Sequence, residues 1–412
     1  MQLMDQTSFR PSEARRLEET GLSHTLLVDL VLRCAFLEGT ILLSDLVERL
    51  KLPSEVVESL YRYLYEERLC ESRSYENKIS LNSKGRSLAE VALKKTQYVG
   101  PAPVPLKDYT HAVTLQALRL DASPERLRSA LNDLVLADRI IKELGSALLN
   151  RGTILLYGST GNGKTSVAER FPRLFDDSVY IPYAVEVSGQ IVSVFDPLVH
   201  QAALPEPATL DRRWLLCKRP MVKVGGELRL DMLDTRVDEA TRICTAPVQM
   251  KANNGILLID DFGRQRITPR ELLNRWIVPL DRGNDILSLP SGFNFEIPFE
   301  LLVVFATNLS LTDLAEDAFI RRLKNKIKID TLSSDLFRTL LKRVCKEGNI
   351  PCSAETQEYI IQQCLEHSPD ALRGCFPTDL VSIACGNAAF DGRRTALDKA
   401  SVDEVINMYF AR

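Results

Sequence analysis

The chain has 412 residues, of which 45% are hydrophobic and 26% are charged, and its formal net charge is −3. This composition is that of an ordinary globular protein and excludes a wholly disordered or fibrous chain, while the length favours two or three domains. The near-neutral charge provides no bulk attraction to nucleic acid. No apolar run approaches the ~18 residues that a membrane-spanning helix needs.

The cysteines and the first residues of the chain indicate a compartment. Nine cysteines and four histidines are scattered along the sequence, and no two cysteines have the C-x-x-C spacing. This pattern predicts neither a zinc site nor a disulfide framework, and it favours buried free thiols in a reducing environment. The polar start of the chain lacks the apolar core of an export signal. We therefore expect a cytoplasmic protein.

The N-terminal part predicts a polar tail over residues 1–19 and a winged-helix-like domain over residues 20–96. Apolar residues recur there at helical spacing, and a third helix begins at Pro53. Two short strands around a polar tip at residues 72–77 follow, and another helix begins at Ser83. Helix, helix-turn-helix, hairpin and helix is the element order of a winged helix.

The third helix of this domain, Pro53–Arg68, is unsuited to reading DNA. Its polar face carries four glutamates against two arginines, so it would repel phosphate. Protein docking or self-assembly is the favoured role, and DNA binding is the disfavoured alternative. Exposed aromatic side chains can anchor a protein partner, and the candidates on this helix are Tyr61, Tyr63 and Tyr65.

The next segments predict a linker followed by an α/β region. Residues 97–122 begin with closely spaced prolines, which favour a stiff extended linker. Ser123 and Pro124 are typical of a helix start, and we expect a single helix from there to about Leu149. From residue 123 to about 330 the pattern alternates between strands and helices, and the remainder is helical throughout.

The strongest signal in the sequence is a phosphate-binding loop. An apolar strand, Ile154–Tyr157, runs into a string that satisfies G-x-x-x-x-G-K-[ST] in its strand–loop–helix context. The glycines let the backbone approach phosphates, and the N–H groups of the loop and of the next helix supply partial positive charge. We expect Lys164 to reach the β- and γ-phosphates and the Thr165 hydroxyl to bind Mg²⁺. The predicted nucleotide-binding residues are Gly158, Ser159, Thr160, Gly161, Asn162, Gly163, Lys164, Thr165 and Ser166.

Two further strands end in polar residues. The strand that reaches Ile259 is followed by Asp260 and Asp261. Two adjacent acids usually mark a solvated turn, but with the loop upstream they predict that Asp260 holds Mg²⁺ and Asp261 polarises the attacking water. A strand over 301–306 leads to Asn308, whose amide would orient the water or the γ-phosphate. Taken alone, such an asparagine is more often a turn residue.

Together these motifs make residues 123–412 resemble the AAA+ ATPases. In this resemblance residues 158–165 are the Walker A motif, residues 256–261 are the Walker B motif, and Asn308 is sensor 1. The resemblance implies ATP and Mg²⁺ as ligands and a homo-oligomer, a hexameric ring. The fold it implies is a P-loop NTPase core with a parallel sheet and flanking helices over 123–330, and an all-α lid over 331–412.

The resemblance also assigns arginines. The string at residues 318–323 is similar to the arginine-finger segment of the family, in which Arg322, or else Arg321, reaches the γ-phosphate bound by a neighbouring subunit. Without the family, these residues belong to a solvated basic face. The sensor-2 arginine of the family is replaced here by Thr378, and Arg373 is the residue that could substitute for it. The Walker B motif also ends in Asp261 where the family has glutamate, which favours slow hydrolysis.

An insert is expected at about residues 209–235. The string Ala-Asn-Asn-Gly before the Walker B strand resembles the magnesium-chelatase and enhancer-binding-activator branch, which carries an insert in its second helix. The insert contains Gly225 and Gly226 at the tip of a predicted hairpin. Its basic residues between Arg212 and Arg229, with Trp214 among them, would either line a ring pore and grip a client or form a surface or subunit interface.

Four functions fit these motifs. The whole chain resembles a bacterial group of winged-helix AAA+ ATPases, for which a chaperone-like remodelling of a protein client is expected. The first alternative is an ATP-dependent scaffold or switch with weak hydrolysis. The second is a winged-helix ATPase that acts on DNA, and the third is a small-molecule kinase, against which the N-terminal module and the helical tail argue.

Overall fold

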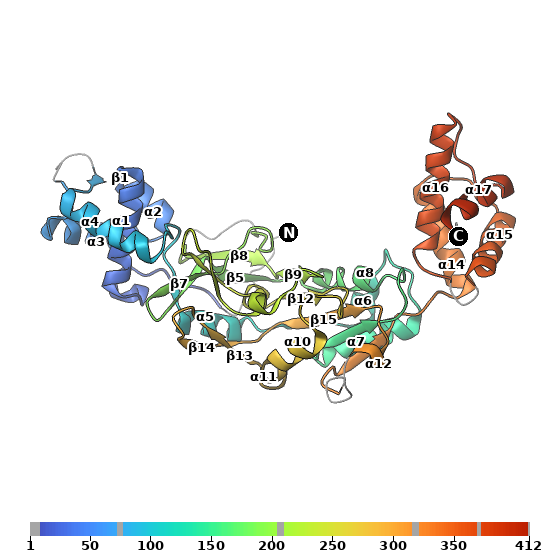
Figure 1. The fold of residues 1–412 in the computed structure, drawn as a ribbon, viewed down its shortest axis with the longest axis horizontal. Coiled ribbons are helices and arrows are strands. Elements are labelled where there is room, and N and C mark those ends of the chain that lie inside the picture. The colour runs from blue at the N-terminus through green and yellow to red at the C-terminus, as the bar shows by residue number, and fades with distance from the viewer. Residues whose placement is uncertain (1–8, 72–76, 204–209, 315–320, 369–371, 411–412) are drawn as a thin grey trace. The chain divides into compact units, whose positions relative to one another are not determined.

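The computed structural model describes residues 9–71, 77–203, 210–314, 321–368 and 372–410 (Figure 1). The chain divides into two compact units, each assembled from separate stretches of sequence. The first unit comprises residues 1–119, 175–257 and 266–302. The second comprises residues 120–174, 258–265 and 303–412. The predicted α/β core is therefore shared between the two units.

The first unit begins with a helical region whose element order differs from the predicted one, because a strand that the sequence did not predict lies between the first two helices and pairs with the strand at residues 78–80. Strands β1 and β2 pair antiparallel, with Ile41 opposite Ile79, and the helices pack around a core that includes Leu27, Leu30 and Leu60. The tip of the predicted wing lies outside the described residues. The elements are α1 (His24–Glu38), β1 (Thr40–Leu42), α2 (Leu43–Leu50), α3 (Ser54–Glu66), β2 (Lys78–Ser80) and α4 (Ser83–Lys95).

The rest of the first unit is rich in short strands. One sheet has the strand order β10-β11-β7-β6-β3, and two separate antiparallel pairs are formed by β5 with β8 and by β13 with β14. The elements are β3 (Val104–Pro105), α5 (Leu106–Leu115), β5 (Ser178–Pro182), β6 (Ala184–Val187), β7 (Gln190–Ser193), β8 (Trp214–Lys218), β9 (Met221–Val224), β10 (Arg236–Val237), β11 (Cys244–Thr245), α9 (Val248–Lys251), α10 (Pro269–Arg275), α11 (Ile277–Arg282), β13 (Asn284–Ser288) and β14 (Asn294–Pro298).

The predicted linker over 97–122 is wrong for most of its length. Val104 and Pro105 form β3, which pairs parallel with β6, and α5 follows at once. Val104 is fully buried, and the Ala102 N–H donates to the Leu50 carbonyl oxygen. The prolines do favour extended backbone, but here the extended segment becomes a strand because a partner strand lies beside it.

The second unit contains the strand that carries the phosphate-binding loop. The central sheet has the order β16-β4-β15-β12-β9, in which β4 pairs parallel with both β15 and β16. This parallel sheet with flanking helices confirms the predicted P-loop NTPase type of core. The elements are α6 (Pro124–Ala130), α7 (Asp138–Leu149), β4 (Ile154–Tyr157), α8 (Lys164–Ala168), β12 (Ile256–Ile259), β15 (Leu302–Thr307), α12 (Leu311–Leu314) and β16 (Asn325–Lys328).

The single helix expected from Ser123 to Leu149 is wrong, because the structure has α6 and α7 with a break between them. Asp133 lies in this break, and its carboxylate accepts hydrogen bonds from Arg170 and Arg173. The two arginines thus stabilise a non-helical turn that the local sequence does not indicate.

The C-terminal part is helical, as predicted. Its helices bury their apolar faces in a core of their own that includes Phe337, Ile360 and Leu380. The cysteines of the described residues, in this part and elsewhere in the chain, are free thiols, as predicted. The helices are α14 (Ser334–Glu347), α15 (Ala354–His367), α16 (Phe376–Phe390) and α17 (Lys399–Tyr409).

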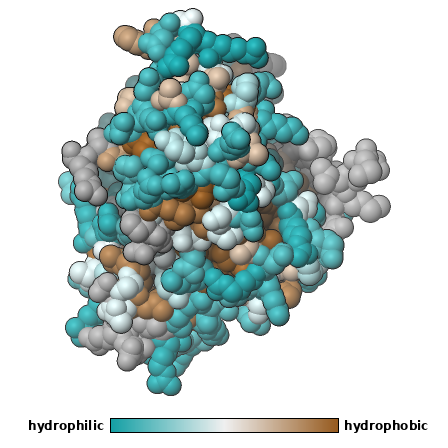
Figure 2. Space-filling view, turned by 90° about the vertical axis from the view of Figure 1, so that its right-hand side faces the viewer, coloured by the Kyte–Doolittle hydropathy of each residue, from teal (hydrophilic) through white to brown (hydrophobic). Residues whose placement is uncertain are grey.

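The surface is mostly hydrophilic on the face shown in Figure 2, where hydrophobic residues appear in groups between hydrophilic ones. Large hydrophobic side chains are exposed at separate positions, such as Leu198 and Phe390. In the described part of the chain, every helix is too short or too polar to span a bilayer.

Candidate functional site

The phosphate-binding loop leaves the end of β4 in a conformation that needs glycine. Gly158 has φ 134° and Gly161 has φ 80°, values that side chains rarely tolerate. A Cβ atom on Gly158 would lie 2.4 Å from the carbonyl oxygen of Ile329, so the loop starts in close contact with the chain after β16. The loop then turns into α8, which begins at Lys164.

Lys164 is held inside this loop. Its side chain is buried, and Nζ donates to the carbonyl oxygens of Gly158 at 2.9 Å and Ser159 at 2.8 Å. Burial lowers the pKa of Lys164, while the nearby carboxylates of Asp261 and Asp260 act in the opposite direction. A desolvated ammonium group gains more from a phosphate oxygen than from a neutral carbonyl. The loop therefore presents a cation that a phosphate can recruit.

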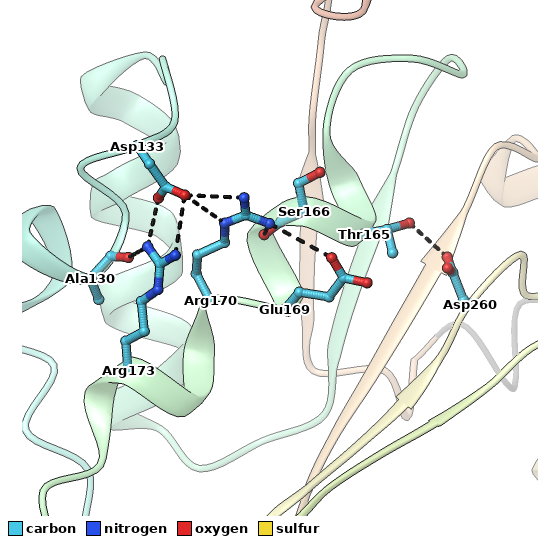
Figure 3. A network of polar contacts seen from close by, with 8 residues as sticks. All are labelled: Ala130, Asp133, Thr165, Ser166, Glu169, Arg170, Arg173 and Asp260. Atoms are coloured by element: carbon cyan, nitrogen blue, oxygen red, sulfur yellow. Dashed lines mark hydrogen bonds and ion pairs between the residues drawn. The ribbon is translucent and has the colours of Figure 1, made fainter. Parts of the chain in front are cut away.

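Thr165 and Asp260 meet at the start of α8. The Thr165 hydroxyl donates to Oδ1 of Asp260 at 2.7 Å, although the two residues are far apart in sequence (Figure 3). Hydroxyl and carboxylate oxygens are the ligands that Mg²⁺ prefers, and this ion usually keeps phosphate and water ligands as well. Among the described residues, no group of three or more histidine, cysteine, aspartate or glutamate side chains is arranged so that it could hold a metal ion. The pair thus fits an ion that a nucleotide brings with it.

Asp261 has an unusual backbone. It is exposed and has φ 49°, in the left-handed region, and its N–H donates to Oδ1 of Asp260. The side chain of Gln265 holds this turn, because Nε2 donates to the carbonyl oxygens of Asp260 and Asp261 while Oε1 accepts from the Gly263 N–H. Strained backbone that its surroundings enforce is common at functional sites. Gln265 was missed in the sequence, and no motif signal there could have found it.

Asn308 lies at the end of β15, the strand between β4 and β12 in the sheet. The neighbouring Thr307 hydroxyl donates to the Phe262 carbonyl oxygen at 2.6 Å, which fixes the strand end against the chain after β12. Oδ1 of Asn308 is buried and has no hydrogen-bond partner among the described residues. Buried polar atoms are rarely left unpaired, so this oxygen is available to a ligand or a water.

The segment before α16 contacts the loop directly. The Cys375 N–H donates to the Gly161 carbonyl oxygen at 2.7 Å, and the Gly374 N–H donates to Oδ1 of Asn162 at 3.2 Å. We call these two hydrogen bonds the clamp around Gly374. Arg373 directly precedes Gly374, and Nε of its guanidinium is buried without a partner among the described residues. Thr378 is exposed. Arg373 lies near the loop, since its Cβ is 3.8 Å from the position of a Cβ atom on Gly161, and its role in place of the sensor-2 arginine stays a prediction.

An ion-pair network supports the other side of α8. The Asp133 carboxylate accepts from Arg173 at 2.7 Å and from Arg170 at 3.1 Å, and Arg170 also donates to the Ser166 carbonyl oxygen (Figure 3). These hydrogen bonds, that of Arg173 above all, lower the pKa of Asp133 to about 2. The network fixes the residues that follow Thr165, and it was missed in the sequence.

The predicted arginine finger is only partly described. Residues 318–320 of its segment lie outside the described residues, whereas Arg321 is exposed and Arg322 is half-buried. An arginine finger acts on a site in another subunit, so its assignment remains a prediction.

The insert differs from the expectation. Residues Met221–Val224 form β9, which lies next to β12 in the central sheet, so the predicted hairpin at Gly225 and Gly226 is wrong. Arg213 and Trp214 are buried, and Arg213 pairs with Asp211 and donates to the carbonyl oxygens of Thr20 and Pro103. These two side chains stabilise the first unit and cannot grip a client.

Arg219 is buried as well. Its guanidinium pairs with Asp177 at 2.6 Å and donates to the Asn254 carbonyl oxygen, just before β12. The sequence suggested a basic surface because arginine is usually exposed. The basic residues of the insert that are exposed, and could still contact a partner, are Lys218, Lys223 and Arg229.

Comparisons with known proteins give limited matches. A family model described as a domain of unknown function (DUF8689) matches residues 333–408, the four C-terminal helices. None of the curated proteins matches the chain. Among solved structures, NtrX from Brucella abortus in complex with ADP is similar, with 15% identity and a TM-score of 0.36 over 62% of this chain. The match covers 51% of NtrX, so this chain spans about half its length.

A point mutant of RuvB from Thermotoga maritima is also similar, with 12% identity and a TM-score of 0.41, over 68% of this chain and 72% of RuvB. These scores are low, and the candidate site is therefore assigned from its own residues.

Proposed function

We propose that this chain is an AAA+ ATPase that binds ATP with Mg²⁺, hydrolyses it at the subunit interfaces of an oligomeric ring and uses the energy to remodel a protein client. The observation that carries the proposal is the hydrogen bond between Thr165 and Asp260. It joins the first turn after a G-x-x-x-x-G-K-[ST] loop to the paired carboxylates on another strand. A structural turn would not need this pairing of loop, cation and carboxylates.

The residues divide the chemistry among themselves. Lys164 exchanges its loop carbonyls for the β- and γ-phosphate oxygens and neutralises their charge. Thr165 and Asp260 would hold Mg²⁺, which would supply positive charge to stabilise the phosphate groups during hydrolysis. Asp261 accepts the proton of the attacking water, and the unpaired oxygen of Asn308 orients that water.

A second subunit completes the site. Arg322, or else Arg321, supplies a planar cation to the transferred phosphoryl group of the neighbour. Arg373 and the clamp around Gly374 connect the nucleotide to the C-terminal helices, so that hydrolysis changes the position of these helices. The client contacts the N-terminal helical region, where Tyr65 is exposed on α3, or the exposed basic residues of the insert.

The test is ATP turnover per subunit measured over a wide range of protein concentration. A steep rise with concentration is expected, because a trans arginine is present only after assembly. A substantial rate that does not depend on concentration would contradict the subunit-interface site and favour a self-contained kinase-like site. In parallel, Lys164→Ala should abolish ATP binding, and unchanged affinity would contradict the nucleotide site itself.

A second candidate is an ATP-dependent switch with weak hydrolysis. The backbone of Asp261 favours it, since a shorter carboxylate on a turn held by Gln265 has little freedom to approach the γ-phosphate. In that case ATP binds and sets the assembly state, while turnover stays near zero at every concentration. An ATPase that acts on DNA is disfavoured, and it would need turnover that DNA stimulates in a salt-sensitive manner.

A further inference from the structure

A cavity lies entirely within the first unit. Its volume is about 780 Å³, within the roughly 300–1,000 Å³ typical of small-molecule sites. Its walls come from α1, the end of α4, the turn between β6 and β7, and the segments around β10, β11 and the end of β13. Elements from both the helical region and the strand-rich region therefore enclose one space.

Arg33 is the unusual group in this cavity. It lines the wall from α1 and is only 3% exposed, yet its Nε has no hydrogen-bond partner among the described residues. Its Nη1 reaches the carbonyl oxygen of Thr96 at 3.5 Å, the limit of a hydrogen bond. A buried guanidinium costs free energy unless its N–H groups and its charge are compensated. Arg33 is thus incompletely compensated.

Asp29, an acidic residue close to Arg33 in the sequence, does not compensate the charge of Arg33 alone. Asp29 lies one helical turn before Arg33 on the same wall, but its carboxylate pairs with Lys95 at 3.1 Å. Arg242 adds a further cation to the lining, against Glu239 on the acidic side. The lining of the cavity therefore contains three basic side chains and two acidic ones. An anion that enters the cavity meets a net positive lining.

The same walls offer apolar surface. Leu26 on α1 and Ile191 on β7 line the cavity together with Val237, next to the basic groups. A ligand that satisfies both halves has an anionic end and an apolar body. We propose that this cavity binds a small organic anion in which a carboxylate or phosphate group is attached to an apolar body.

The anionic group lies against Arg33, where a planar guanidinium can donate two parallel hydrogen bonds to a carboxylate or phosphate. The apolar body packs on Leu26 and Ile191. Such a ligand bridges α1 and β7, and so stabilises the contact between the helical region and the strand-rich region of the first unit. This proposal does not depend on nucleotide binding by the other unit.

The test uses two fluorescent probes that differ in charge. The anionic probe 8-anilinonaphthalene-1-sulfonate and the uncharged N-phenyl-1-naphthylamine are titrated against the full chain. The wild type should bind the anionic probe more tightly. Arg33→Met keeps the apolar stem and removes the charge, so it should weaken the anionic probe about 10-fold, corresponding to one charge-assisted hydrogen bond, and leave the uncharged probe unchanged.

Arg62→Met is the matched control, because Arg62 lines a separate groove of α2 and α3 and not this cavity. It should bind both probes as the wild type does. The proposal is overturned if Arg33→Met binds the anionic probe with wild-type affinity, or if Arg62→Met loses as much as Arg33→Met.

A second variant keeps the proposal testable in case Arg33→Met does not fold. Ser291→Trp fills the cavity from an exposed position on its wall and keeps Arg33, so it should weaken both probes while the thermal unfolding transition is retained. Wild-type affinity for both probes in this variant overturns the proposal. Displacement of the anionic probe by octanoate or by octyl phosphate then identifies the head group, whereas displacement by octanol and by neither anion overturns it.

Discussion

At the scale of single residues, Asp261 is where chemistry and backbone strain coincide. Asp261→Asn keeps the size of the side chain and removes the base, so we expect the rate constant of hydrolysis to fall about 100-fold or more, as for loss of a general base. ATP affinity should change little, because Lys164 and Thr165 remain. Single-turnover hydrolysis and equilibrium nucleotide binding measure the two effects separately.

The control for this prediction is Asp261→Glu, which retains a carboxylate and adds reach. It should keep or increase the rate. If Asp261→Asn hydrolyses ATP as fast as the wild type, another group positions the water, and Asp261 contributes only its backbone to the turn that Gln265 holds.

The same residues show what the sequence could and could not predict about the site. The roles of Lys164, Thr165 and Asp260 follow from motif spacing, and the structure brings the last two to 2.7 Å. Gln265 escaped prediction, because a glutamine that donates to backbone carbonyls leaves no pattern of charge or periodicity. The same holds for the N–H of Cys375, since backbone contacts do not depend on residue type.

At the scale of elements, the contact between the loop and the start of α16 can be tested by its packing. A Cβ atom on Gly161 would lie 2.6 Å from Sγ of Cys375, and φ there is 80°. Gly161→Ala should therefore weaken ATP binding about 10-fold, because the left-handed backbone alone costs an alanine about 1 kcal/mol or more. Isothermal titration of each variant with ATP provides the measurement.

Two further variants separate the clash from the backbone strain. Cys375→Ala removes the sulfur, so the double variant Gly161→Ala/Cys375→Ala should recover part of the lost affinity, and Cys375→Ala alone should bind ATP normally. A double variant no better than Gly161→Ala would show that the contact with α16 does not contribute.

The network behind α8 has a pH dependence whose sign follows from Asp133. Its folded-state pKa of about 2 is below the ordinary 3.8, so the folded protein keeps this carboxylate ionised where the unfolded chain takes up a proton. The stabilisation is fully present above about pH 5 and is lost as the pH falls towards 2. Asp133 is partly exposed, which limits the effect to about 0.5–1 kcal/mol after screening by solvent.

Asp133→Asn should therefore have a lower free energy of unfolding than the wild type at pH 7, and this difference should be about half as large at pH 3, which lies between the folded pKa of about 2 and the ordinary 3.8. Urea unfolding at both pH values measures this difference. Asp138→Asn, which removes an acid paired with Arg128 at the exposed surface, serves as the matched control. A gap between Asp133→Asn and the wild type that is unchanged at pH 3 would contradict the assignment.

Elements differed in how well the sequence predicted them, for a physical reason. β4, β12 and β15 are almost wholly buried apolar runs, and their bounds agree with the prediction to within about a residue. Such strands are recognised locally. The break between α6 and α7, the strand at Val104 and the position of β9 depend on partners far along the chain. Local patterns therefore predicted a longer helix, a linker and a hairpin in their place.

At the scale of the whole molecule, the proposed ring has a consequence that no single chain can show. Each active site would use Asp261 from one subunit and Arg322 from the next. We expect Arg322→Ala to bind ATP normally and to lose about 1,000-fold in turnover, as for removal of an arginine finger. Asp261→Asn should be inactive because it lacks the base that accepts the proton of the attacking water, while it keeps Arg322 intact.

Mixing these two inactive variants should restore activity. When an Arg322→Ala subunit provides the nucleotide site and an Asp261→Asn subunit provides the arginine, the interface is complete, and random mixing makes about one quarter of the interfaces complete. Turnover should therefore rise from near zero to about that fraction of the wild-type rate after subunit exchange.

Mixing Arg322→Ala with the double variant Asp261→Asn/Arg322→Ala is the matched control, because no complete interface can form. Equal turnover in the two mixtures would mean that Arg322 acts within its own subunit, or not at all, and Arg321→Ala in the same scheme would then test its neighbour.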